Sequence, residues 1–213
     1  MEQDNYMEIY NFIKIELSEN DNIATKVDRY PFRKRSEHIW RVYNWAKRLI
    51  DLNEYKKLDI NSLLIAALFH DAGYAISPSS KDHAINSEII FKRFIKEHHF
   101  PKDKEEFISY LIKNHSNKHL IENDDTPIEL VLLCEADILD ETGAMSILWD
   151  CMAEGGSENQ SYRKTYEHIK EKTIGTMNRN PMKTKKGKQY WENKQKLVKQ
   201  FINELKFDLI IED

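Results

Sequence analysis

Apolar residues recur at helical spacing along most of the chain, and this periodicity excludes most other folds. Tyr6, Ile9, Ile13 and Leu17, for example, fall on one face of a helix. No segment shows the alternation of apolar and polar residues that is typical of a half-buried strand, and only six glycines and five prolines interrupt the pattern. The sequence therefore predicts an all-α protein and disfavours a parallel sheet.

Capping and breaking residues set the expected helix ends. Asp59 is the predicted N-cap of a helix that is apolar nearly all round, and Gly73 is predicted to end that helix in a left-handed conformation. Asp103 and Glu106 form a capping-box pattern. The helices are expected at about 5–17, 37–51, 59–71, 82–99, 103–115, 126–137, 144–153, 158–173 and 184–207.

Charge and cysteine content narrow the class of protein. A formal net charge of -4 gives no general attraction to nucleic acid or to anionic lipid, so neither partner is expected. Cys134 and Cys151 lie in apolar helical patterns and are expected to be buried, reduced thiols. The acidic start lacks a secretory signal, and no apolar run is long enough to cross a bilayer. A soluble cytoplasmic protein is the prediction.

Titratable residues occur where the pattern calls for buried apolar ones. His70 and Asp71 close the most apolar helix, and Asp137 interrupts another apolar run. An unpaired charge at such positions would be costly, whereas a divalent cation would neutralise the carboxylates and use the lone pairs of the imidazole. The alternative is that each residue is a cap or a hydrogen-bonded core group.

Three motifs in a fixed order favour the metal. They are His38-Ile39-Trp40-Arg41-Val42, Leu68-Phe69-His70-Asp71-Ala72-Gly73 and Glu135-Ala136-Asp137-Ile138-Leu139-Asp140. Together they resemble the HD superfamily of metal-dependent phosphohydrolases, which have a histidine, a His-Asp doublet and a distal aspartate on a compact multi-helix bundle. The resemblance implies metal ligands at His38, His70, Asp71 and Asp137.

The resemblance also implies a possible second ion. Superfamily members with two metals add histidines between the doublet and the distal aspartate, and His83 and His115 match that order. Without the resemblance, both would be read as helix-end residues. Asp71 is then the expected bridging ligand, and Asp71 and His70 are the expected catalytic residues. The ion or ions would be Mn, Fe, Co, Ni, Zn or Mg.

Basic residues are the candidates for binding phosphate. Arg33, Lys34 and Arg35 lie just ahead of His38. Many superfamily members have a lysine shortly after the doublet; here Ala72-Gly73-Tyr74 follows, so Lys81 is the candidate for that role. The alternative for such charges is solvated surface. The run from Lys183 to Lys188 has no assigned role.

These observations lead to one functional hypothesis and one rival. The chain is expected to form a single domain over 1–213, with a core at about 31–142 and the helices of 143–213 packed on it. The hypothesis is a metal-dependent phosphohydrolase that cleaves a phosphoester or phosphoanhydride, in a nucleotide, by metal-activated water. The rival is a non-catalytic helical module of the same type that binds a nucleotide or a protein partner.

Overall fold

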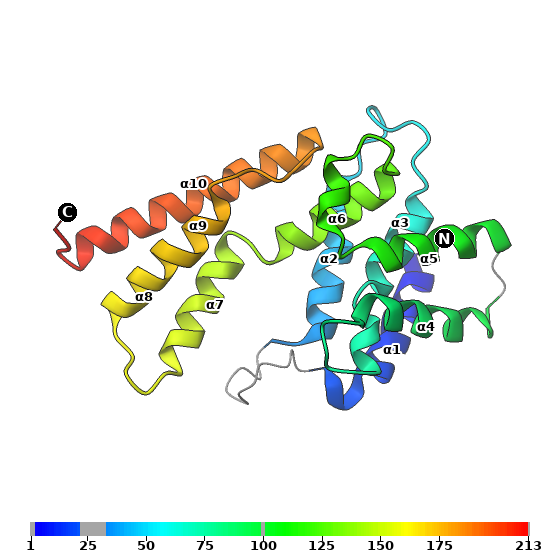
Figure 1. Cartoon of the computed structure of the whole chain (residues 1–213), viewed down its shortest axis with the longest axis horizontal. Coiled ribbons are helices and arrows are strands. Elements are labelled where there is room, and N and C mark those ends of the chain that lie inside the picture. The colour runs from blue at the N-terminus through cyan, green and yellow to red at the C-terminus, as the bar shows by residue number, and fades with distance from the viewer. Residues whose placement is uncertain (1–2, 22–32, 99–100, 213) are drawn as a thin grey trace. The chain divides into compact units, whose positions relative to one another are not determined.

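The computed structural model describes residues 3–21, 33–98 and 101–212. Those residues form helices joined by turns, and no strand occurs among them, which confirms the all-α prediction (Figure 1). The chain divides into two compact units, Met1–Asp137 and Ile138–Asp213. The single-domain arrangement stays a prediction, and each unit is described by itself.

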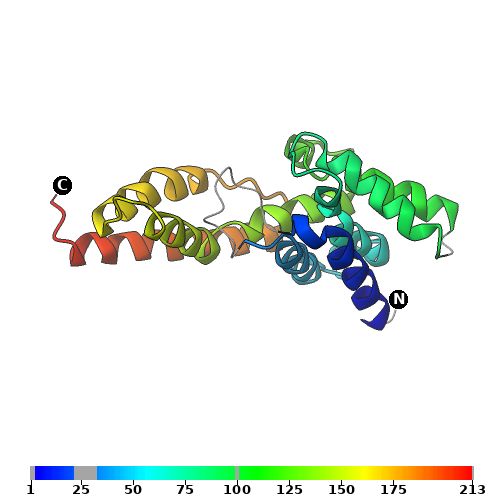
Figure 2. The same cartoon turned by 90° about the horizontal axis from the view of Figure 1, so that it is seen from below.

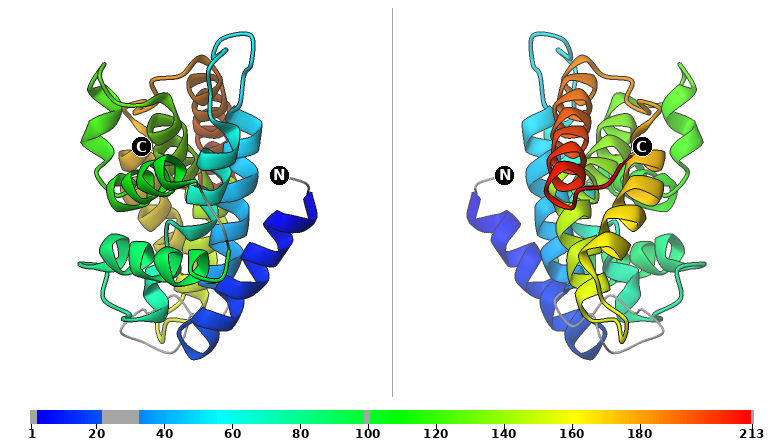
Figure 3. Two further views of the ribbon diagram at one scale, coloured as in Figure 1. Left: turned by 90° about the vertical axis from the view of Figure 1, so that its right-hand side faces the viewer. Right: turned by 90° about the vertical axis from the view of Figure 1, so that its left-hand side faces the viewer.

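The first unit is a bundle of α-helices with short 3-10 turns between them. Figure 2 shows α4 and α5 side by side, and Figure 3 shows α2 beside α3. Helix α6 continues three residues into the second unit. The elements are α1 (Gln3–Leu17), η1 (Ser18–Asn20), α2 (Arg35–Leu49), α3 (Ile60–Phe69), η2 (Ala72–Ala75), α4 (His83–Ile95), α5 (Lys102–Asn114), η3 (Lys118–Glu122) and α6 (Ile128–Asp140).

Helix α3 is the centre of this unit because its apolar residues leave no polar face. Residues 62–69 are all buried. The N-cap prediction is confirmed: Asp59 accepts hydrogen bonds from the Ser62 N–H at 3.2 Å and the Ser62 hydroxyl at 2.7 Å. Glu129 of α6 in turn accepts from the Asp59 N–H at 2.7 Å, so the start of α3 is tied to α6. The start of α3 is thereby fixed against α6.

Turn η2 follows α3 and packs tightly against the start of α4. The Gly73 N–H donates to the Ser87 hydroxyl at 2.8 Å, and that hydroxyl donates to the His70 carbonyl at 2.7 Å. The prediction for Gly73 was wrong, because its φ is not in the left-handed region. A Cβ at this position would instead collide with the His83 carbonyl and the Ser87 amide. Glycine is required here by close backbone approach.

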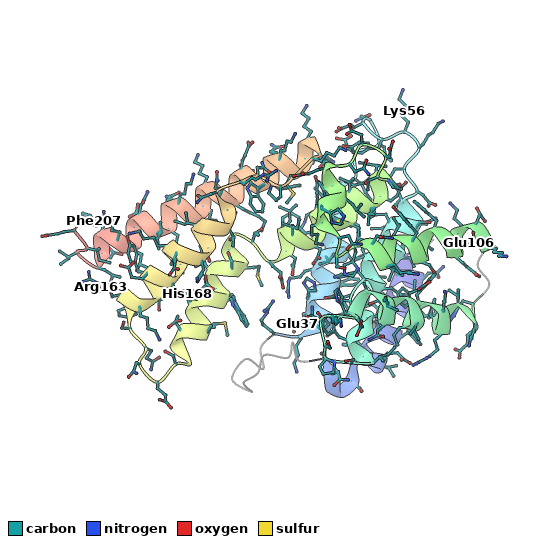
Figure 4. All side chains as sticks on the ribbon, in the orientation of Figure 1. Glu37, Lys56, Glu106, Arg163, His168 and Phe207 are labelled. Carbon is teal, nitrogen blue, oxygen red and sulfur yellow. The ribbon has the colours of Figure 1, made fainter. Side chains whose placement is uncertain are left out.

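Two other local predictions need correction. Helix α5 begins at Lys102 after Pro101, which makes no side-chain cap, so Asp103 and Glu106 do not form the expected capping box; Glu106 is exposed on α5 (Figure 4). Helix α4 ends at Ile95 rather than near residue 99. The N–H of its C-cap, Lys96, donates to the carbonyls of residues 93 and 94. Residues 99 and 100 lie outside the described residues.

The second unit consists of three helical segments lying side by side (Figures 1 and 2). Ser161 caps α8 and Thr184 caps α10, each accepting a backbone N–H. Tyr166, Ile169, Trp191 and other apolar side chains are buried, whereas Phe207 near the end of α10 is 82% exposed (Figure 4). The segments are α7 (Ala144–Gly155), α8 (Tyr162–His168) with the π-helical turn η4 (Ile169–Thr173) and α9 (Ile174–Met177), and α10 (Lys185–Asp208).

Neither cysteine forms a disulfide. Cys134 is buried, as predicted, and burial raises the pKa of its thiol to about 11. Cys151 is only half-buried, so full burial was wrong for this residue. None of the helices formed by the described residues combines the length and hydrophobicity that a membrane span requires.

We expect Gly73→Ala to lower the free energy of unfolding by about 1–3 kcal/mol, because the added methyl group overpacks the η2–α4 contact. Urea denaturation measures this change. Gly175→Ala is the matched control: a Cβ there meets nothing within 4 Å, and alanine in a helix is expected to stabilise by about 0.5–1 kcal/mol. Equal stability of the two variants would contradict the packing account.

Candidate metal centre

Six predicted residues from five helices converge in the first unit. Within this set, ligand atoms form overlapping groups of three that lie within 4.8 Å of one another. Four of the residues stand at or next to helix ends. The residues are His38 in α2, His70 and Asp71 directly after α3, His83 at the start of α4, His115 directly after α5, and Asp137 in α6.

One half of the cluster contains His38, His70, Asp71 and Asp137. The Nε2 atoms of His38 and His70 are 3.2 Å apart. His38 Nε2 is 3.4 Å from Asp71 Oδ2 and 3.2 Å from Asp137 Oδ1. His70 Nε2 is 3.7 Å and 3.9 Å from the same two oxygens. Two imidazoles and one oxygen from each carboxylate therefore surround a common point.

The other half contains His83, His115 and the second oxygen of Asp71. The Nε2 atoms of the two histidines are 3.1 Å apart. Asp71 Oδ1 is 3.6 Å from His83 Nε2 and 3.5 Å from His115 Nε2. Asp71 thus turns Oδ2 toward His38 and His70, and Oδ1 toward His83 and His115. This is the position of a carboxylate that could bridge two cations.

Backbone hydrogen bonds fix which ring nitrogens can bind a metal. The Nδ1 atoms of His70, His83 and His115 lie 2.8, 2.6 and 2.7 Å from the carbonyl oxygens of residues 67, 80 and 112. A carbonyl only accepts, so each Nδ1 carries the proton and each neutral ring keeps its Nε2 lone pair. With both rings in the neutral form, the Nε2 atoms of His83 and His115 would present two facing lone pairs.

The donor set therefore fits a divalent cation. Two facing lone pairs about 3 Å apart repel unless a positive charge lies between them, and nitrogen ligands at about 2 Å from one ion have a similar separation. Mixed imidazole and carboxylate donors suit transition metals. The residues that could hold the ions are His38, His70, Asp71, His83, His115 and Asp137.

Burial and neighbouring charges set the protonation of these groups. Burial lowers the pKa of His70 to about 3 and also lowers that of His83, so both rings are neutral at pH 7. Burial by itself would raise the pKa of Asp71, but His70 and Arg35 hold it well below its usual range. Asp71 is therefore charged. Lys118 likewise holds the pKa of Asp137 well below its usual range, so Asp137 is charged as well.

Two cations contact these carboxylates. Arg35 Nη1 pairs with Asp71 Oδ2, and its guanidinium carbon lies 3.8 Å from the centre of the Tyr74 ring. The same ring stacks on His83, with the two ring centroids 5.2 Å apart. Lys118 Nζ is 2.5 Å from Asp137 Oδ2. The side chain of Arg35 is 10% exposed, whereas that of Lys118 is 34% exposed.

The structure treats the predicted phosphate-binding residues differently. It brings Arg35 into contact with Asp71, while Arg33 and Lys34 are half-buried just before α2. Lys81 is exposed in the turn before α4, where its backbone N–H donates to the Ser79 hydroxyl. Lys118 was missed in the sequence, although it follows His115 as closely as Arg35 precedes His38.

Comparison with known proteins establishes the family. The family model described as HD domain matches residues 35–142, just over half of the chain. The chain therefore belongs to the HD domain family, which confirms the resemblance seen in the three motifs. HD domains bind divalent metals, in agreement with the donor set described above. Comparison with curated proteins gave no match.

Solved structures share the fold. An HD-superfamily hydrolase from Bacillus thuringiensis has a TM-score of 0.66 at 22% identity, covering 99% of this chain and 99% of that chain. A predicted HD superfamily hydrolase from an uncultured Thermotogales bacterium has a TM-score of 0.63 at 18% identity, covering 95% and 92%. Bacillus subtilis YpgQ, in complex with ADP, has a TM-score of 0.63 at 19% identity, covering 96% and 95%.

Proposed function

We propose that the protein is a metal-dependent phosphohydrolase that uses water to cleave a phosphoester or phosphoanhydride bond in a nucleotide. The observation that carries the proposal is the convergence of four imidazoles and two carboxylates, with Asp71 turned toward both imidazole pairs. A divalent cation bound there would lower the pKa of water and polarise a phosphoryl oxygen.

The charge of the cluster favours an anionic substrate. Asp71 and Asp137 are offset by Arg35 and Lys118, so these four side chains sum to zero. His70 and His83 add no charge at pH 7. Any bound divalent cation therefore makes the site positive, and a phosphate group is attracted to it. The net charge of the chain gives no such attraction by itself.

Residues of this chain would hold and orient the substrate. Arg35 is fixed between Asp71 and the face of Tyr74, and its buried Nε has no hydrogen-bond partner among the residues that the structure describes. A buried N–H without a partner is unfavourable, so an acceptor such as a phosphate oxygen would satisfy it. A nucleotide is the substrate class we propose because YpgQ, with the same fold, was solved with ADP.

We expect the purified protein, loaded with Mn, Fe or Co, to release phosphate or pyrophosphate from at least one member of a broad nucleotide panel. Asp71→Ala should abolish both turnover and metal binding, because it removes the carboxylate that faces both imidazole pairs. Asp125→Ala, at an exposed position, is the control and should change neither. Turnover by Asp71→Ala would remove this residue from the centre.

The absence of turnover in the wild-type protein would leave the rival module, which also binds metal. Metal content therefore cannot separate the two functions, and released phosphate is the measurement that does. A panel that yields no product with any of the three metals would contradict the phosphohydrolase.

We expect two metal ions per chain in protein prepared in excess metal without oxygen. His83→Ala or His115→Ala should lower the count toward one, because each removes a ligand from one half of the cluster and leaves His38, His70, Asp71 and Asp137 in the other. Elemental analysis gives the count. A wild-type count of one, unchanged in both variants, would refute the second ion and leave the four-ligand site intact.

We expect Arg35→Ala to raise KM for the anionic substrate by about tenfold or more, since a charged hydrogen bond to phosphate is lost. The metal count should stay the same. Arg35→Lys, which keeps the charge, tests how much of the effect needs the guanidinium, and circular dichroism checks that both variants fold. An unchanged KM for every anionic substrate would place Arg35 outside the substrate site.

A further inference from the structure

Lys118 differs from the other charged groups of the cluster in its access to solvent. Its side chain is 34% exposed, compared with 10% for Arg35, 6% for Asp71 and 19% for Asp137. Of these four charged side chains, that of Lys118 therefore has the greatest access to solvent. Lys118 Nζ contacts Oδ2 of Asp137, whereas Oδ1 of the same carboxylate faces His38 and His70. The ammonium and the two imidazoles therefore contact different oxygens of Asp137.

The backbone that carries Lys118 is held firmly beside the cluster. Lys118 begins η3, three residues after His115, and its N–H donates to the Ser116 carbonyl at 3.0 Å. The middle of η3 is held by the Thr126 hydroxyl, which donates to the Leu120 carbonyl at 2.7 Å. The His115 carbonyl accepts from the Cys134 thiol at 3.2 Å. The backbone of Lys118 is thus held in place, and the length of its four-carbon side chain limits how far the ammonium can move.

A cation bound beside Asp137 would weaken the hold of this carboxylate on Lys118. The carboxylate carries one negative charge, and a cation held by His38, His70 and Oδ1 of Asp137 would share it with the ammonium. The cation would also repel the ammonium across a short distance. Arg35 is in a different position, because it is buried and lies on Tyr74. Of the two cations, Lys118 therefore has the more exposed side chain and, among the described residues, no aromatic ring contact of the kind that Arg35 makes.

We propose that Lys118 is a substrate-binding residue whose ammonium exchanges Asp137 for a phosphate oxygen when metal and nucleotide are both bound. This inference rests on the proposed function, and it selects substrates with at least two phosphates. One phosphate would bind at the residues that could hold the ions, and Lys118 would contact the next phosphate. The motion needs rotation about side-chain bonds only, since η3 stays in place.

The rival explanation is that Lys118 only supports Asp137. The two explanations give opposite signs for metal binding. A supporting role predicts that removal of the ammonium loosens Asp137 and weakens metal binding. An exchanging role predicts tighter metal binding, because the ammonium competes with the metal for the charge of Asp137.

The test measures two affinities by isothermal titration calorimetry. Mn²⁺ is titrated into metal-free protein, and α,β-methylene-ADP, which resists hydrolysis, into Mn²⁺-loaded protein. We expect Lys118→Met to lower the Kd for Mn²⁺ and to raise the Kd for α,β-methylene-ADP by about tenfold or more. Lys118→Arg should keep nucleotide affinity near that of the wild type. Lys113→Met is the control, because it removes the charge of a lysine in α5 that pairs with Glu88 outside the cluster. This variant should change neither of the two affinities.

Each result decides the inference. Nucleotide affinity of Lys118→Met within twofold of the wild type, or weaker Mn²⁺ binding, overturns it, and Lys118→Gln replaces Lys118→Met if the latter does not fold. Lack of nucleotide binding by the wild type also overturns it. Turnover is scored separately: a wild type that binds the nucleotide through Lys118 but releases no phosphate overturns the proposed function alone. Turnover that is independent of Lys118 overturns this inference alone.

Discussion

The buried charge of Asp71 is the constraint around which the first unit is organised. A carboxylate out of water costs several kcal/mol unless it is paired and hydrogen-bonded. Here it lies 5% exposed among Arg35 and four imidazoles, which come from four different helices or their ends. Each of those helices must therefore meet the end of α3 at a set distance. The same packing of helices that pairs the buried carboxylate therefore also assembles the donor set.

A recurring local device aims the imidazoles. His70, His83 and His115 each donate from Nδ1 to the carbonyl three residues earlier, and each stands at or beside a helix end. The carbonyls of residues 67 and 112 lie in the last turns of α3 and α5, where they lack helical partners, and the carbonyl of residue 80 lies in the turn before α4. The ring orientation is then set by adjacent backbone rather than by distant side chains. The fold must bring the helix ends together, and the local hydrogen bonds then orient the Nε2 atoms of these three histidines.

The sequence predicted the class of fold and the members of the cluster for clear reasons. Helical periodicity is a local signal, and a titratable residue such as Asp137 in an apolar run is conspicuous. The N-cap at Asp59 was also predicted, because one side chain determines it. Gly73 was misread, since its role depends on α4 lying close by, and such a long-range approach leaves no mark in a single sequence. Lys118 was overlooked because one lysine among many surface lysines carries no signal of its own. The ligand roles themselves, inferred from family resemblance, stay predictions.

The separation of the cluster residues along the chain bears on how the protein is made. His38 and Asp137 lie 3.2 Å apart at their polar atoms, although most of α2 and all of α3, α4 and α5 are synthesised between them. A ribosome that has produced α5 has supplied every imidazole of the cluster but not the carboxylate of α6. Contacts so distant in sequence form late and slow the folding of a domain. Until α6 emerges, the nascent chain lacks Asp137, so the full donor set of the cluster can form only after α6 is in place.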